Sequence, residues 1–235
     1  MKTTLHRADD RGKGEHGWLS TRHSFSFANW YDPTRMGFGA LRVLNDDTVA
    51  PKKGFGMHSH ANFEIITIVL KGAVTHEDSL GNQETVRAGE VQTMSAGTGV
   101  THSEINREDD PLELFQLWIE PNKQNISPRY AQRKFDTAGR RGKWQMLVSG
   151  GNVSGTLPIH QDVRIARAEL ETGKTLDYQL SSGEHGVYLF VIGGKIETAG
   201  EILERRDAIG IRDVKTISIK ALSPASLLLI EVPLA

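Results

Sequence analysis

The chain has 235 residues, 38% of them hydrophobic, which is enough for one large β domain or for two domains of roughly 100 residues each. Its 28 basic and 29 acidic side chains give a formal net charge of -1, so no overall field would draw it to nucleic acid or to an anionic membrane. It has no cysteine, which excludes disulfides, thiolate metal ligands and cysteine nucleophiles.

The first residues of the chain show no secretory pattern. Residues 1–17 carry charged side chains throughout and leave no apolar stretch of the kind found in a signal peptide. A run of about 18 apolar residues, the length that could span a bilayer, is absent from the sequence. We therefore expect a monomeric, cytoplasmic protein without a membrane or nucleic-acid partner.

Short β-branched runs separated by glycine turns predict a mostly-β protein, because long helical periods are scarce. A turn over Asp78 to Asn82 is expected to join two strands of the first half as a hairpin. In chain order, the expected strands are Ala40 to Leu44, Glu64 to Leu70, Ala73 to Glu77, Glu84 to Val86, Val91 to Ser95, Leu112 to Ile119, Arg164 to Leu170, Val187 to Ile192, Lys195 to Thr198, Ala208 to Ile211, Thr216 to Ile219 and Leu227 to Val232.

The two halves of the chain share a local pattern. The segments 65–74 and 187–196 each run from an apolar strand through a glycine turn into another strand. A repeated β unit of about 100 residues predicts two similar barrels or sandwiches, joined within residues 122–151. We expect a metal-binding domain over residues 1–125 and a domain without metal ligands over residues 126–235.

Two short motifs could supply metal ligands. His58 and His60 are two residues apart, and so are His102 and Glu104. In an extended strand this spacing puts both side chains on the same face. Two such strands facing each other inside a barrel would bring the four side chains to one divalent cation. Glu64 follows the first pair of histidines and is an alternative carboxylate ligand.

The sequence around these motifs resembles the cupin superfamily and, within it, the bacterial pirin-like proteins. Ser95 stands where the second cupin motif usually has proline, which favours a subfamily over a generic cupin. The strings that carry the resemblance are HGWL (16–19), HSFSFANWYDP (23–33), LRVLNDD (41–47), HSH (58–60), HEDSLGN (76–82) and MSAGTGVTHSE (94–104). It is close over the first half and loose over the second, and it implies an all-β bicupin of two jelly-roll β-barrels.

The resemblance also implies which carboxylate binds the metal. In pirins the glutamate of the second motif joins the three histidines, and that position here is Glu104. Glu64 is then either an outer partner that orients a ligand histidine or an exposed strand residue. Three imidazoles and a carboxylate suit iron, our first expectation, but also manganese, cobalt, nickel or zinc.

Bacterial proteins with these motifs are linked to quercetin 2,3-dioxygenase activity, so the resemblance implies a flavonol and dioxygen as substrates. Glu104 would then be the catalytic base that takes the proton of the flavonol hydroxyl. One alternative is a metal-containing regulatory or adaptor protein, as eukaryotic pirins are, which would act through protein contacts. Another is a cupin enzyme with a different small substrate, because one fold hosts many reactions.

The other histidines are not paired with a second histidine or a glutamate at this spacing. We expect His76, His160 and His185 to be surface or loop histidines. The basic runs 140–143 and 205–206 are expected in solvated loops. Five apolar side chains near the motifs could line a substrate mouth, but the expectation for each is an ordinary core position: Phe55, Met57, Phe63, Phe115 and Trp118.

Overall fold

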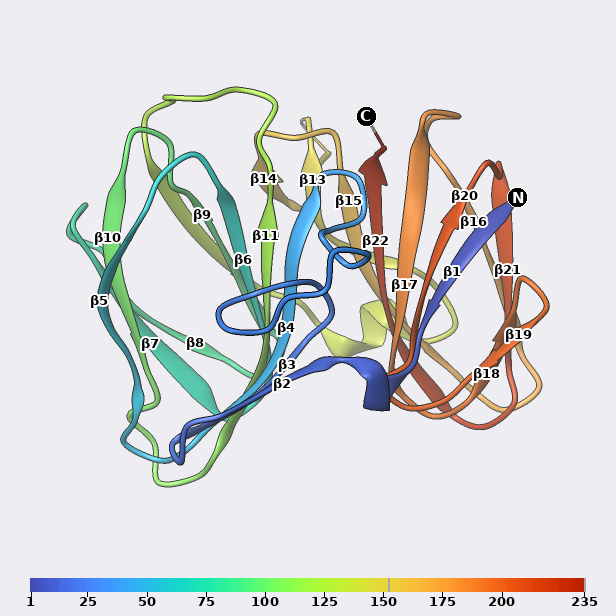
Figure 1. The fold of residues 1–235 in the computed structure, drawn as a ribbon, viewed down its shortest axis with the longest axis horizontal. Coiled ribbons are helices and arrows are strands. Elements are labelled where there is room, and N and C mark those ends of the chain that lie inside the picture. The colour runs from blue at the N-terminus through green and yellow to red at the C-terminus, as the bar shows by residue number, and fades with distance from the viewer. Residues whose placement is uncertain (152, 235) are drawn as a thin grey trace.

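The computed structural model describes residues 1–151 and 153–234 and shows two β-barrels side by side (Figure 1). Over that part of the chain the regular structure is strands and two short 3₁₀ helices, η1 (Ala8–Asp10) and η2 (Thr137–Arg140), with no α-helix. The expected all-β fold of two barrels is confirmed. None of the described helices is long and apolar enough to cross a membrane.

The first barrel consists of a seven-stranded sheet in the order β12-β9-β6-β11-β4-β3-β2 and a four-stranded sheet in the order β5-β10-β7-β8. The paired strands of both sheets are antiparallel. Their bounds are β2 (Gly12–Glu15), β3 (Leu19–His23), β4 (Leu41–Val49), β5 (Gly54–His60), β6 (Glu64–Lys71), β7 (Ala73–Asp78), β8 (Gln83–Arg87), β9 (Glu90–Ser95), β10 (Val100–Ile105), β11 (Leu112–Ile119) and β12 (Arg129–Lys134).

The second barrel repeats this plan with a seven-stranded sheet in the order β1-β20-β17-β22-β15-β13-β14 and a four-stranded sheet in the order β16-β21-β18-β19. Its strands are β1 (Lys2–His6), β13 (Gln145–Gly150), β14 (Leu157–Ile159), β15 (Arg164–Leu170), β16 (Thr175–Gln179), β17 (His185–Gly193), β18 (Ile196–Thr198), β19 (Glu201–Leu203), β20 (Ala208–Arg212), β21 (Thr216–Ala221) and β22 (Ala225–Pro233).

Sheet membership departs from a division of the chain at residue 125 at two strands. Strand β1 pairs with β20 and so belongs to the second barrel, although it is the first strand of the chain. Strand β12 comes after residue 125 but pairs with β9 of the first barrel. Each of these strands covers an open sheet edge of the barrel that it joins, which removes unpaired backbone groups from solvent.

The largest apolar cluster lies between the barrels, where the two seven-stranded sheets face each other (Figure 1). Phe115 of β11 and Phe190 of β17 meet there with ring centroids 5.1 Å apart. A second cluster fills the interior of the second barrel. The first barrel instead has two small interior clusters, around Val69 and around Ile65, so the rest of its interior is open to polar side chains.

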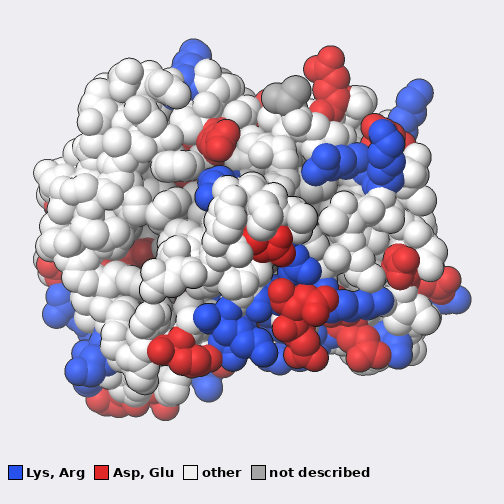
Figure 2. All heavy atoms as spheres, in the orientation of Figure 1, with Lys and Arg blue, Asp and Glu red and all other residues white. Residues whose placement is uncertain are grey.

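The basic runs are not wholly in solvated loops. Arg140 is buried and donates to Glu169 at 2.7 Å, and Arg206 is buried with its Nε 3.3 Å from Asp46. The Arg206 guanidinium also lies 5.2 Å from the centre of the Phe115 ring. The expectation is therefore wrong for these two arginines, because each finds a carboxylate at the junction of the barrels. On the face shown in Figure 2 the charges of the two signs are interspersed.

Candidate metal centre

Strands β5 and β10 bring three histidines together. They are antiparallel neighbours with His102 directly opposite His58, and His60 follows on the same face as His58. The ring centroids are 4.5 Å apart for His58 and His102, 4.8 Å for His58 and His60, and 5.0 Å for His60 and His102. One nitrogen of each ring lies within 4.8 Å of the others, so the three rings could hold one ion.

The hydrogen bonds of these rings leave suitable nitrogens free. Nδ1 of His58 is 2.8 Å from the carbonyl oxygen of Gly56, which makes Nδ1 the protonated nitrogen and leaves the Nε2 lone pair for a metal. Nε2 of His102 is buried and has no hydrogen-bond partner among the described residues. A buried nitrogen without a partner is costly unless a ligand satisfies it, so the donor set fits a metal ion.

Burial also keeps these rings neutral. Burial first, and then the neighbouring histidines, lower the pKa of His60 to about 4 and the pKa of His102 to about 3. A neutral imidazole offers the lone pair that a metal needs, whereas an imidazolium offers none. At neutral pH a metal would therefore not have to displace protons from these two residues.

Glu104 of β10 lies beside His102 but in a second group. One of its carboxylate oxygens is within 4.8 Å of ligand atoms of His76 and His102, so His102 is shared by both groups. The carboxylate is 3% exposed and anchored by three donors. These donors are Gln92 Nε2 at 2.6 Å, Gln116 Nε2 at 2.6 Å and Thr67 Oγ1 at 3.0 Å.

Glu64, the alternative carboxylate, is held in a different place. It is buried, so of the two alternatives left open for it the exposed strand residue is wrong. Its carboxylate accepts a hydrogen bond from Ser95 Oγ at 2.7 Å, and burial raises its pKa. The strand register explains this contact, because Glu64 of β6 lies opposite Ser95 of β9.

His76 also lies at the centre, although the sequence alone predicted a surface or loop histidine. It is fully buried on β7, with Nε2 2.9 Å from Asp78 and Nδ1 3.3 Å from Nδ1 of His102. Its ring stacks on Tyr130 with centroids 4.5 Å apart. The expectation of a surface or loop histidine is wrong because β7 pairs with β10 and sets His76 opposite Glu104.

The other two single histidines lie away from this centre. His185 is also buried, which again differs from expectation, and its Nδ1 is 2.9 Å from Glu231 in the second barrel. His160 is half-buried outside the strands, as expected of a loop residue. His76 and Asp78 have a same-face spacing, but so do His160 and Asp162, so this sequence signal alone would not have singled out the buried histidine.

An apolar pocket of about 270 Å³ lies beside the histidines. Phe55, one of its walls, has its ring centroid 6.3 Å from that of His58. Asp47 lines the pocket with one oxygen that has no partner among the described residues, and burial raises its pKa to about 7. The remaining lining residues are His16, Trp18, Leu19, Thr21, His23, Phe27, Ala28 and Asn45.

The five apolar side chains near the motifs lie in different surroundings. Trp118 packs against His60 with ring centroids 4.9 Å apart, and Phe63 packs on Trp118. Phe115 points away from the centre into the cluster between the barrels, and Met57 is exposed. Of the five, Phe55 alone lines the pocket.

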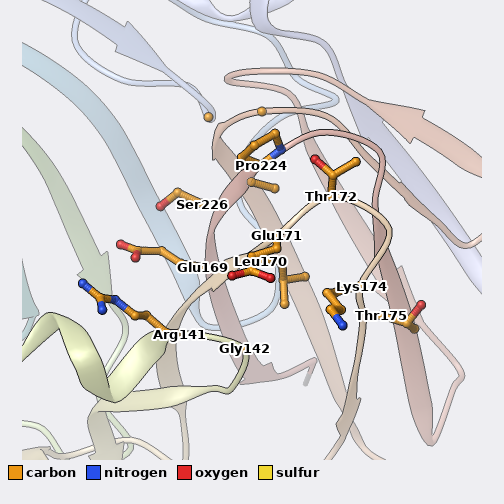
Figure 3. A pocket seen from close by; sticks show the side chains of 13 residues that line it. Arg141, Gly142, Glu169, Leu170, Glu171, Thr172, Lys174, Thr175, Pro224 and Ser226 are labelled. Atoms are coloured by element: carbon orange, nitrogen blue, oxygen red, sulfur yellow. The ribbon is translucent and has the colours of Figure 1, made fainter.

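A larger pocket of about 1030 Å³ lies in the second half of the chain (Figure 3). Arg141, Glu169, Glu171 and Lys174 surround it, so its polar groups are charges of both signs. Among the described residues, both groups with metal-ligand geometry are in the first barrel, and none lines this pocket. The candidate metal ligands found among the described residues therefore all belong to the first barrel.

Comparison with known proteins agrees with this arrangement. Residues 5–119 match the family described as Pirin, and residues 146–232 match the quercetinase C-terminal cupin domain. Quercetin 2,3-dioxygenase of Escherichia coli K12 is 44% identical over 230 residues, 97% of this chain and 98% of that protein. A pirin-like protein of Caulobacter vibrioides is 44% identical over 224 residues, 95% of this chain and 96% of that protein.

Solved structures show the same fold. The bacterial pirin YhhW of Escherichia coli in complex with nickel(II) has a TM-score of 0.94 and 42% identity, and each chain covers 100% of the other. A quercetin 2,3-dioxygenase of Acinetobacter baumannii has a TM-score of 0.78 at 21% identity, with 98% of this chain and 86% of that chain covered. The expected fold of two cupin domains is confirmed.

Proposed function

The chain belongs to the pirin family, and on that premise we propose that it is a metal-dependent dioxygenase that opens the ring of a flavonol such as quercetin. The observation that carries this proposal is the meeting of three histidines, two of them with depressed pKa values, next to an apolar pocket whose wall residue Phe55 has its ring 6.3 Å from that of His58. Similar proteins named quercetin 2,3-dioxygenase support the choice of substrate.

His58, His60, His102 and Glu104 are the proposed ligands of one divalent ion. Iron is our first choice, with manganese, cobalt, nickel and zinc as alternatives. When bound, the ion supplies Lewis acidity and an open coordination position. Glu104 is the proposed base for the proton of the flavonol hydroxyl; its carboxylate lies beside His102 and two amide donors hold it in one orientation, which supports this role.

The apolar pocket is the proposed substrate site. Phe27 and Phe55 give it aromatic walls, which suit a planar ring system. Asp47 is the one carboxyl among the described residues that line the pocket, and its raised pKa allows it to act as a hydrogen-bond donor at neutral pH. At about 270 Å³ the pocket is slightly below the usual range for ligand sites, about 300–1,000 Å³, which favours a smaller hydroxylated aromatic as the second candidate.

Metal-loaded protein tests the proposal. We expect oxygen uptake and carbon monoxide release when quercetin is added to protein loaded with Fe(II), and loss of both in the variant His58→Ala. The variant His160→Ala is the control, since that residue lies outside the centre. If protein with a confirmed metal content turns over no flavonol with any of the five metals, the proposed flavonol dioxygenase activity is wrong. Turnover of a smaller phenol alone would favour the second candidate. The cytoplasmic localisation and the monomeric state of the protein remain predictions from the sequence.

A further inference from the structure

We propose that His76 and Asp78 are positioning residues that hold His102 in the tautomer that presents Nε2 to the metal. The inference rests on the proposed metal centre and concerns a part of it to which neither the motif spacing nor the comparisons assign a role. It starts from a continuous chain of contacts: Asp78 Oδ2 is 2.9 Å from His76 Nε2, and His76 Nδ1 is 3.3 Å from His102 Nδ1.

The direction of these hydrogen bonds begins at Asp78. Its carboxylate is surrounded by donors, namely the backbone N–H groups of Leu80 and Asn82 at 2.9 and 3.0 Å and the Asn82 side-chain amide at 2.9 Å. A carboxylate in such a setting accepts from each partner, so the proton between Asp78 and His76 belongs to His76 Nε2.

The rest follows from the chemistry of a neutral imidazole. With its proton on Nε2, His76 has a lone pair on Nδ1 and accepts a hydrogen bond there. The donor is Nδ1–H of His102, so the lone pair of His102 is on Nε2. The reverse arrangement would place an N–H on His102 Nε2, an atom with no partner among the described residues, and would leave no lone pair there for a metal.

The packing holds this chain rigid. His76 is fully buried between the Tyr130 ring, with centroids 4.5 Å apart and an interplanar angle of 21°, and the His102 ring at 5.2 Å. The Tyr130 hydroxyl lies 2.9 Å from Gln132 Oε1 and 3.1 Å from Gln92 Oε1, and Gln92 donates to Glu104. One network therefore supports both ligands that β10 is proposed to supply.

Two variants test the chain of hydrogen bonds from Asp78 through His76 to His102. His76→Phe keeps a ring on Tyr130 but removes the acceptor for His102. Asp78→Asn keeps the size but can place an amide donor opposite His76, which would reverse both tautomers. For each we expect a loss of about 10–100-fold in metal affinity, measured by competition with a chelator, and a changed visible spectrum of the Co(II)-loaded protein. Glu77→Gln, between the two residues and partly exposed on β7, is the matched control with unchanged affinity.

Nitrogen NMR of the metal-free protein reports the tautomer directly and does not depend on turnover. We expect His102 to carry its proton on Nδ1 in the wild type and on Nε2 in Asp78→Asn. A wild-type His102 protonated on Nε2, or folded variants that bind metal as tightly as the wild type, would overturn the proposal. If flavonol turnover fails while the tautomer and the affinity losses are as expected, only the proposed function falls.

Discussion

Glu104 combines two proposed roles, metal ligand and base, in one anchored carboxylate. In the variant Glu104→Gln an amide NH₂ group would replace one oxygen and face donors, since Gln92 and Gln116 both donate to this side chain. We expect flavonol turnover to fall by about 10²–10⁴-fold, the usual contribution of a general base, and metal affinity to weaken. Steady-state oxygen uptake measures the first effect and chelator competition the second.

The control for that variant is Glu84→Gln, because Glu84 is an exposed residue of β8. It should leave both turnover and affinity unchanged. Full turnover by Glu104→Gln would show that the base lies elsewhere.

The burial of Asp47 predicts a pH effect on stability. Its pKa is raised from 3.8 to about 7 in the folded protein, so between pH 4 and pH 7 the folded state keeps a proton that the unfolded chain has released. The free energy of unfolding therefore falls as the pH rises through this window, by about 1.4 kcal/mol for each unit of pKa difference. Asp47→Asn cannot ionise, so its stability relative to the wild type should increase from pH 4 to pH 7.

Denaturant unfolding of both proteins across this pH range measures the difference. Taking the difference is necessary because the depressed pKa values of His6, His60 and His102 act in the opposite direction and are common to both proteins. A difference that is constant from pH 4 to pH 7 would show that Asp47 is ionised throughout.

Among the elements, β5 shows how closely two strands must approach to form the centre. A Cβ atom on Gly54 would lie 2.2 Å from the carbonyl oxygen of Glu104 and 2.6 Å from Cα of Ile105. Gly54→Ala should therefore force β5 away from β10 and separate His58 from His102. We expect a loss of about 1–3 kcal/mol in the free energy of unfolding and a weaker metal affinity.

Gly56 on the same strand supplies the control. A Cβ atom there meets nothing within 4 Å, so Gly56→Ala should change neither quantity appreciably. Denaturant unfolding measures the stability of the two variants, and competition with a chelator measures their metal affinity. Equal behaviour of the two would mean that the contact between β5 and β10 does not position the histidines.

The sequence predicted those elements whose signal is local. Alternation within one strand identified His58 and His60 as same-face neighbours, and the structure places both in one group with His102. His76 could not be found in this way, because its role depends on the pairing of β7 with β10, which brings residues 76 and 104 together across the sheet. The missed strands include the short β2, β14 and β19, which few residues define, and also β1, β3, β12, β13 and β16, which have five or six residues each.

At the scale of the whole molecule, the repeated pattern predicted two barrels but not how they exchange strands. The alternation of residues within β1 and β12 carries no mark of the sheet that each joins, because either edge would accept a strand. The burial of Arg140 and Arg206 was equally invisible, since their carboxylate partners are far away in sequence. A local sequence pattern does not show which distant strand or side chain a segment will contact.

The junction of the barrels contains a charge cluster built around one carboxylate. Asp46 of the first barrel lies 3.3 Å from both Arg11 Nη2 and Arg206 Nε. The two guanidinium groups rest on the Phe190 and Phe115 rings of the cluster between the barrels, each 5.2 Å from a ring centre. Both arginines are buried, so Asp46 balances charge that water cannot reach freely.

Replacing this carboxylate should therefore destabilise the whole molecule. We expect Asp46→Asn to lower the free energy of unfolding by about 3–5 kcal/mol, because it leaves two buried guanidinium groups without a counter-charge. Asp213→Asn is the control, since Asp213 pairs with Lys2 through side chains that are 56% and 81% exposed, and such a pair contributes about 0–1 kcal/mol. Denaturant unfolding measures both, and a loss in Asp46→Asn no larger than in the control would mean that the two arginines find other partners at the junction.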